Sequence, residues 1–119
     1  MLTFEEAQEA LDEIAQSLPQ EIFKNLNGGY ALTEQTLYDE NGLVILGQYH
    51  HEPYGLGRYV TVHYGSMLEV YGYLRPSAFR AKLKYVLHHE LVHHLESLAG
   101  DRSLEIQDEI DKAKMLHKF

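Results

Sequence analysis

The apolar positions at the start of the chain recur at helical spacing. The pattern follows Thr3, which forms a capping-box sequence with Glu6, and it ends at Pro19. The apolar positions of this predicted helix are Phe4, Ala7, Leu11, Ile14, Ala15 and Leu18. Pro19 is also suited to the first turn of a helix, so we expect a second, short helix over residues 22–26.

The middle of the chain has the patterns of strands and turns. Apolar and polar positions alternate loosely over residues 30–37. Residues 39–42 are typical of a hairpin turn, and residues 43–46 predict a buried strand. Residues 50–57 contain two glycines and a proline and predict a loop. Residues 58–64 are β-branched and aromatic, which predicts a strand that Gly65 ends.

The last part of the chain returns to helical spacing. A short helix is expected over residues 66–70. Pro76 begins the longest predicted helix, which runs to about Leu98 and is ended by Gly100. A last helix is expected over residues 102–116. Helices, a small mainly antiparallel sheet and further helices predict an α+β fold.

Composition narrows this prediction to one globular domain. The 119 residues are 45% hydrophobic and 24% charged, which suits a single domain over residues 1–119 with a real core. The net charge of −8 argues against nucleic acid or an anionic membrane as partner. The N-terminal segment is acidic, without the basic and apolar regions of a signal peptide, so we expect a cytoplasmic protein. With no cysteine, any metal ligand must be His, Asp or Glu.

The long predicted helix contains the H-E-x-x-H motif over residues 89–93. His89 and His93 lie one turn apart on the same face, so both imidazoles can reach one zinc ion. Glu90 stands beside the first histidine, where it can act as general base toward a water that zinc activates. This chemistry predicts hydrolysis, most simply of a peptide bond.

The helical wheel separates this motif from the core. With His89 at zero, His93 falls near 40° and Glu96 near 340°. The leucines fall on the opposite side, at roughly 120° to 240°. They are Leu83, Leu87, Leu91, Leu95 and Leu98. A histidine pair opposite the leucines favours a metal site over an ordinary solvated helix face.

Several acidic residues are candidates for the third metal ligand. Asp101 is our first choice because Gly100 allows the chain to turn back toward the metal, although Asp101 can also cap the last helix. Glu96 shares the helix face of the histidines. Glu105 and Asp108 can reach back from the last helix, or can serve its dipole.

The other histidines have less specific interpretations. His88 points away from the metal face, and we expect it to be exposed. His94 falls on the leucine side, where a hydrogen-bonded core histidine is expected. His63 or Tyr64, at the end of a predicted strand, can stabilise an oxyanion or simply pack across strands. His50 is expected in the loop over residues 50–57.

Two segments together resemble a known family. They are Gly-Arg-Tyr-Val-Thr-Val-His-Tyr-Gly-Ser over residues 57–66 and His-His-Glu-Leu-Val-His-His-Leu-Glu over residues 88–96. These segments resemble the minimal zincins, small bacterial proteins assigned to the zinc metallopeptidases and long carried as a domain of unknown function. The resemblance extends over residues 4–111.

The resemblance implies a reduced zincin fold, with a small sheet over the active-site helix. His89 and His93 match the metal ligands of the family and Glu90 its general base. The family commonly has a glycine three residues after the second histidine and an aspartate three residues later. Here these positions are Glu96 and Ala99, and Gly100-Asp101 resembles the same turn displaced by two residues.

The resemblance also implies an edge strand along the cleft, to which an extended peptide adds as a further strand. Residues 58–64 are the candidate edge. The sequence thus predicts a zinc peptidase acting on a peptide or protein. The alternative is a zincin-derived module that binds metal or peptide with weak or no catalysis, and a hydrolase of non-peptide substrates would use the same chemistry.

Overall fold

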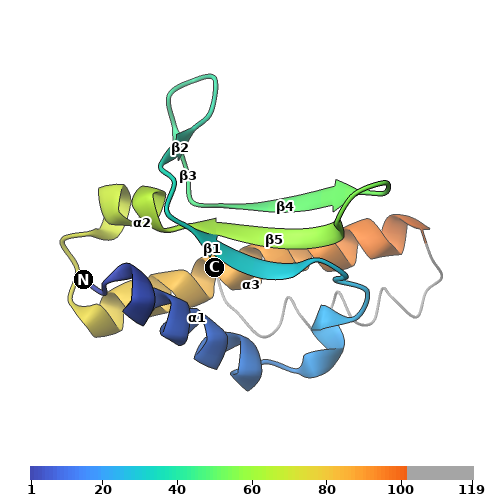
Figure 1. The fold of residues 1–119 in the computed structure, drawn as a ribbon, viewed down its shortest axis with the longest axis horizontal. Helices are drawn as coiled ribbons and strands as arrows, with labels where there is room; N and C mark the ends of the chain where they lie inside the picture. Colours follow the sequence, from blue (N-terminus) through green and yellow to red (C-terminus); the bar gives the residue numbers. More distant parts are fainter. Residues whose placement is uncertain (102–119) are drawn as a thin grey trace.

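The computed structural model describes residues 1–101, and Figure 1 shows their arrangement. The first helix, α1 (Phe4–Ser17), begins where its capping box predicts. The Thr3 hydroxyl accepts a hydrogen bond from the Glu6 amide at 3.2 Å, and the Glu6 carboxylate accepts one from the Thr3 amide at 2.9 Å. These two bonds satisfy helix donors that would otherwise lack partners. After Pro19 the chain forms the short 3-10 helix η1 (Gln20–Phe23).

Three strands form a mixed sheet. They are β1 (Gly29–Thr33), β4 (Gly47–Glu52) and β5 (Gly57–His63), in the order β1-β5-β4. Strand β1 is parallel to β5, and β4 is antiparallel to it. A separate antiparallel hairpin contains β2 (Leu37–Tyr38) and β3 (Val44–Ile45), and it projects from the sheet in Figure 1.

Two predictions about the strands were wrong. The segment expected as an edge strand forms β5, which is central, so the edges of the described sheet are β1 and β4. His50 and His51 belong to β4 rather than to a loop, because they pair with Tyr59 and Arg58 of β5. The loop between β4 and β5 is correspondingly short. Gly57, the first residue of β5, has a φ of 73°, a conformation that favours glycine.

The predicted buried strand over residues 43–46 also differs from the structure. Only Val44 and Ile45 are paired, both are half-buried, and Leu43 is 65% exposed. The turn before them forms as expected. The Asp39 carboxylate accepts hydrogen bonds from the amides of Asn41 and Leu43, at 2.8 and 2.9 Å.

Two further helices complete the described fold. Helix α2 (Tyr64–Tyr71) follows β5 directly, and α3 (Pro76–Asp101) runs beneath the sheet next to α1 (Figure 1). The leucine stripe of α3 is buried as predicted, with each side chain at most 3% exposed. Its members are Leu83, Leu87, Leu91, Leu95 and Leu98. They pack with α1 and with Val60 and Val62 of β5 in one core. The fold is α+β, as the sequence predicts.

The predicted end of the long helix was wrong. Helix α3 continues through Gly100 to Asp101. Glycine is often found just after a helix, but it is also tolerated inside one at a cost of about 1 kcal/mol. The helix predicted over residues 102–116 lies outside the described residues. No helix in residues 1–101 has the length and apolar character needed to cross a membrane.

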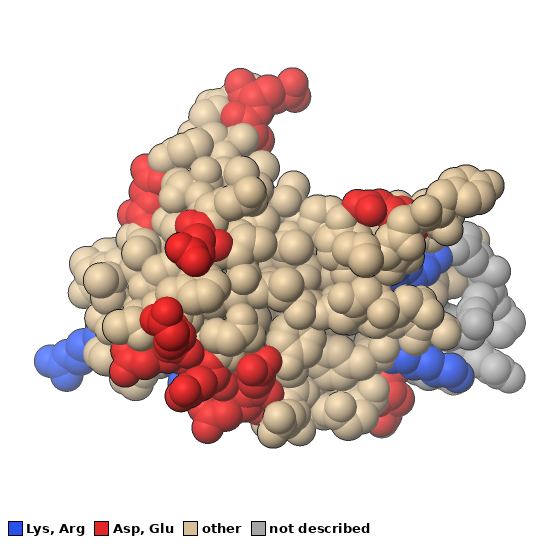
Figure 2. All heavy atoms as spheres, viewed as in Figure 1, with Lys and Arg blue, Asp and Glu red and all other residues tan. Residues whose placement is uncertain are grey.

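The negative charge is unevenly distributed over the described surface. Figure 2 shows acidic side chains gathered over α1 and at the tip of the β2–β3 hairpin. Those exposed on α1 are Glu5, Glu6, Glu9 and Glu13, and Glu40 is exposed at the hairpin tip. This charge lies away from the leucine-packed core, where unpaired carboxylates would be costly.

Candidate functional site

His89 and His93 bring their imidazoles together on the exposed face of α3. Their Nε2 atoms are 3.2 Å apart, and the two rings are nearly perpendicular, with centroids 4.7 Å apart. Two imidazole nitrogens at 2.0–2.1 Å from one tetrahedral zinc ion would lie roughly 3.3–3.4 Å apart. The two histidines therefore fit as two ligands of such an ion.

Electrostatics also favours the neutral, metal-binding form of His89. Partial burial lowers the pKa of this imidazole below its usual value, and the neighbouring His93 lowers it further. The Glu96 carboxylate acts in the opposite direction on the same pKa. A histidine must be deprotonated to bind a metal, so a lowered pKa extends binding toward lower pH.

Glu90 differs from both histidines because its side chain is buried. Only 8% of it is exposed, and burial raises the pKa of the carboxyl to about 7. Removing a carboxylate from water disfavours its charged form. A carboxyl with a pKa near neutrality can both accept and return a proton at physiological pH, which suits a general acid–base residue.

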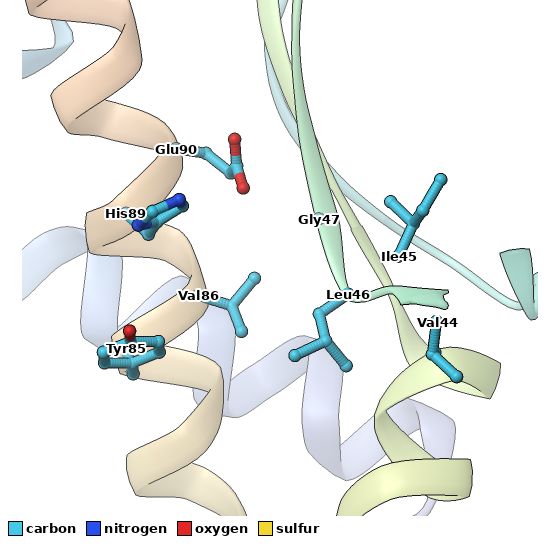
Figure 3. A pocket seen from close by; sticks show the side chains of 8 residues that line it. All are labelled: Val44, Ile45, Leu46, Gly47, Tyr85, Val86, His89 and Glu90. Carbon is cyan, nitrogen blue, oxygen red and sulfur yellow. The ribbon is translucent and has the colours of Figure 1, made fainter. Parts of the chain in front are cut away.

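A pocket of about 300 Å³ opens beside this carboxyl, between α3 and the segment that joins the hairpin to β4. Figure 3 shows the Glu90 carboxylate projecting from α3 toward β4 at Gly47. The pocket is lined by Val44, Ile45, Leu46, Gly47, Tyr85, Val86, His89 and Glu90. Two residues of the motif thus face the same hollow.

Gly47 is a residue of this site that sequence analysis missed. A Cβ atom there would lie 2.7 Å from Val86 Cγ1, 3.2 Å from the Thr61 carbonyl oxygen and 3.3 Å from Glu90 Cγ. Only glycine lets β4 approach α3 this closely next to the carboxyl. A glycine inside a strand-like pattern is a signal of such an approach.

The structure describes only the backbone of Asp101, the predicted third ligand. Asp101 required a turn at Gly100, but α3 continues, and its backbone places Asp101 eight residues beyond His93, about 12 Å along the helix axis. Within the described part of the chain, no third His, Asp or Glu joins His89 and His93 in a metal-binding group, so the Glu96 alternative is not supported. The side chain of Asp101, and all of Glu105 and Asp108, lie outside the described residues.

The predictions for the neighbouring histidines have mixed outcomes. His88 was expected to be exposed, but it is 3% exposed. His94 is the hydrogen-bonded core histidine that the wheel predicts, and it is fully buried. The wheel gives the direction of a side chain but not what packs against it, which explains why one prediction failed.

His94 belongs to a buried polar network. Its Nε2 lies 2.8 Å from the Lys24 carbonyl oxygen, and because a carbonyl only accepts, this nitrogen donates. Its Nδ1 therefore accepts from the Tyr49 hydroxyl at 2.9 Å, and that hydroxyl oxygen accepts from Arg58 at 2.9 Å. Burial is the largest cause that lowers the pKa of His94. The network fixes a neutral His94 between η1, β4 and α3.

The oxyanion role considered for His63 or Tyr64 has no geometric support. The His63 ring lies 2.7 Å from the Thr33 hydroxyl and 3.0 Å from the Gln48 side-chain oxygen, so it packs across strands. The Tyr64 hydroxyl donates to the Leu2 carbonyl oxygen at 2.5 Å. Neither residue lines the pocket next to Glu90. Tyr85 does line it and stacks on His89, with ring centroids 6.3 Å apart.

These observations define a class of protein: an α+β domain whose H-E-x-x-H helix borders a pocket next to an edge strand. A conserved hypothetical protein of Thermus thermophilus has a similar structure, with a TM-score of 0.72 and 30% sequence identity. The similarity covers 84% of this chain and 100% of that one. The chain therefore belongs to the same family as the Thermus protein, whose description names no activity. No profile of a known protein family and no curated protein matches the chain.

Proposed function

We propose that the protein is a zinc-dependent peptidase in which His89 and His93 bind the metal and Glu90 is the general base. The observation that carries this proposal is the convergence of the two Nε2 atoms beside a buried carboxyl at a pocket. Zinc held there would supply Lewis acidity and lower the pKa of water. The resemblance to the minimal zincins supports the same assignment.

Glu90 would move the proton in this reaction. With a pKa of about 7, its carboxylate accepts a proton from the attacking water and can return it to the leaving amine. Glu90 lines the pocket, so a peptide bond held at the mouth of the pocket lies within reach of its carboxyl (Figure 3).

Strand β4 would hold the substrate backbone. It is an edge of the described sheet and begins at the pocket with Gly47. An extended peptide can add to such an edge through main-chain hydrogen bonds. This places the role first assigned to residues 58–64 on β4 instead.

The third metal ligand remains a prediction. Asp101, Glu105 and Asp108 are the candidates, and substitution of each by alanine is expected to identify the ligand through weakened zinc binding. If none of the three weakens it, the third ligand does not come from these acids. The cytoplasmic location and the peptide or protein substrate, without nucleic acid or membrane, are part of this proposal.

The test compares Glu90→Gln with Glu9→Gln, the same change at an exposed position of α1. We expect Glu90→Gln to bind zinc as the parent does, and to cleave peptides roughly 10²- to 10⁴-fold more slowly. Calorimetry measures the zinc, and mass spectrometry of a peptide mixture measures cleavage. A parent chain that binds no zinc, or a Glu90→Gln variant that cleaves as fast as the parent, would contradict the proposal.

A second candidate function is a binding module that holds metal or peptide without catalysis. It is favoured by the absence, within residues 1–101, of a third ligand next to His89 and His93. Zinc binding and peptide binding without cleavage by the parent chain would establish this alternative.

A further inference from the structure

The pocket beside Glu90 has apolar walls and one polar end. Val44 and Ile45 come from the hairpin, Leu46 precedes β4, and Val86 comes from α3. Figure 3 shows Leu46 and Val86 pointing toward each other across the space between the two elements. Among the residues that the structure describes, no lysine, arginine or aspartate lines the pocket.

The size of the pocket suits part of a ligand. At about 300 Å³ it lies at the low end of the range for small-molecule sites, which is room for one large side chain. Gly47 at its edge keeps β4 close to α3, since a Cβ there would meet Val86 and Glu90. A substrate backbone bound along β4 and a substrate side chain bound in the pocket would therefore lie on adjoining surfaces.

We propose that this pocket receives a large uncharged apolar side chain, so that the substrates are peptides with a residue such as leucine, methionine or phenylalanine next to the cleaved bond. This inference rests on the proposed function. It follows from the walls, because a charged side chain placed between Leu46 and Val86 would lose water without gaining a partner from them. The polar end with His89 and Glu90 is left for the peptide bond.

A basic side chain is the informative competitor. Its aliphatic stem would pack against the walls, and its charged end would pair with the Glu90 carboxylate. In that ion pair, Glu90 could not act as the general base. Norleucine and lysine have side chains of similar length, so a pair of peptides that differ only in this residue separates apolar contact from charge pairing. A glutamate peptide tests the opposite charge.

The probes are acetyl-Ala-Ala-X-Ala-amide peptides in which X is norleucine, alanine, lysine or glutamate. Binding is measured by NMR titration of the parent chain in a chelator, which removes zinc and so prevents turnover. We expect norleucine to bind about tenfold more tightly than alanine, lysine or glutamate, the range that hydrophobic pockets give for small differences in side chain. Amide shifts at Leu46 and Gly47 should move with the norleucine peptide.

The variants Leu46→Ala and Leu43→Ala give a matched pair. Each shortens a leucine to alanine, and the two positions are close together in the chain. Leu46 lines the pocket, whereas Leu43 is 65% exposed and does not line it. Leu46→Ala is expected to reduce the preference for norleucine over alanine several-fold, and Leu43→Ala to leave it unchanged. Circular dichroism shows whether each variant is folded.

The outcomes separate this inference from the proposed function. Equal or tighter binding of the lysine or glutamate peptide, or an equal effect of Leu43→Ala and Leu46→Ala, would overturn the apolar pocket. Cleavage by the zinc-loaded parent without preference for a neighbouring apolar residue would overturn it while supporting the peptidase. Norleucine preference without any cleavage would support the pocket and overturn the peptidase.

Discussion

Helix α3 carries four histidines on two faces, and the two faces use the same side chain differently. On the exposed face, His89 and His93 place their Nε2 atoms 3.2 Å apart. On the buried face, His94 has both ring nitrogens in hydrogen bonds, to Tyr49 and Lys24. His88 is also buried, at 3% exposed.

This contrast shows that the helix face, rather than the residue type, decides the role of a histidine here. The exposed pair faces solvent and can converge on an ion, and His89 also lines the pocket. The buried His94 instead holds η1, β4 and α3 together through neutral hydrogen bonds. Burial lowers the pKa of both His89 and His94, so a lowered pKa alone would not separate a metal ligand from a structural histidine.

The largest expected effect is on the exposed pair. The variant His89→Ala/His93→Ala should lose zinc binding, because both imidazole ligands are removed. His51→Ala removes an exposed histidine of β4 instead and should bind zinc as the parent does. Calorimetric titration with zinc measures both. If the double variant binds zinc with the affinity of the parent, the metal site lies elsewhere.

The next effect tests the buried face. His94→Ala removes the acceptor of the Tyr49 hydroxyl proton and the donor to the Lys24 carbonyl, and it opens a cavity, so it should cost roughly 2–4 kcal/mol of unfolding free energy. His93→Ala, one residue earlier, should change the unfolding free energy by less than about 0.5 kcal/mol without metal. Urea denaturation in a chelator measures both. Equal losses would show that the two faces do not differ as we describe.

A smaller effect is expected for Glu90. Its raised pKa means that between about pH 4.5 and 7 the folded chain binds a proton that the unfolded chain has released. Its contribution to stability is therefore lost as the pH rises through about 7. Glu90→Gln should raise the unfolding free energy by about 1–3 kcal/mol more at pH 8 than at pH 5, measured in a chelator.

The control for this prediction is Glu9→Gln, an exposed position on α1. Its effect on stability should be nearly the same at pH 8 and pH 5. A Glu90→Gln variant with the same flat dependence would contradict the buried carboxyl that we describe.

The smallest effect concerns a histidine outside α3. Burial, and then the charge of His50, lower the pKa of His63 below 6.5, so the unfolded chain binds more protons than the folded one just below that pH. The contribution of His63 to the free energy of unfolding is complete above pH 6.5 and is lost as the pH falls. His63→Gln should make the fall in unfolding free energy between about pH 6.5 and 5 less steep, as measured by denaturation at several pH values. A slope that stays as steep would contradict this assignment.

Much of the fold was predictable because its signals are local. Thr3 and Glu6 predicted the start of α1, and the leucine stripe predicted the buried face of α3. The positions of β4 and β5 in the sheet were not predictable in the same way. They depend on the parallel pairing of β1 with β5 across the intervening hairpin, and no local pattern specifies that pairing.

The candidate site divides along the same line. His89, Glu90 and His93 were predictable because their spacing along a helix carries the chemistry. Gly47 was not singled out, since its importance comes from the approach of β4 to Val86. The turn expected at Gly100 failed because a glycine permits a helix end without requiring one.

By itself, the sequence determined that two imidazoles lie one turn apart on a face opposite the leucines, because helix geometry fixes the direction of every side chain once the helix forms. Only the tertiary structure decided that Glu90 is buried beside a pocket and that its pKa rises to about 7. That outcome depends on how closely β4 packs against α3. Packing between segments far apart in the chain removes water from a carboxyl, and spacing along one helix contains no information about it.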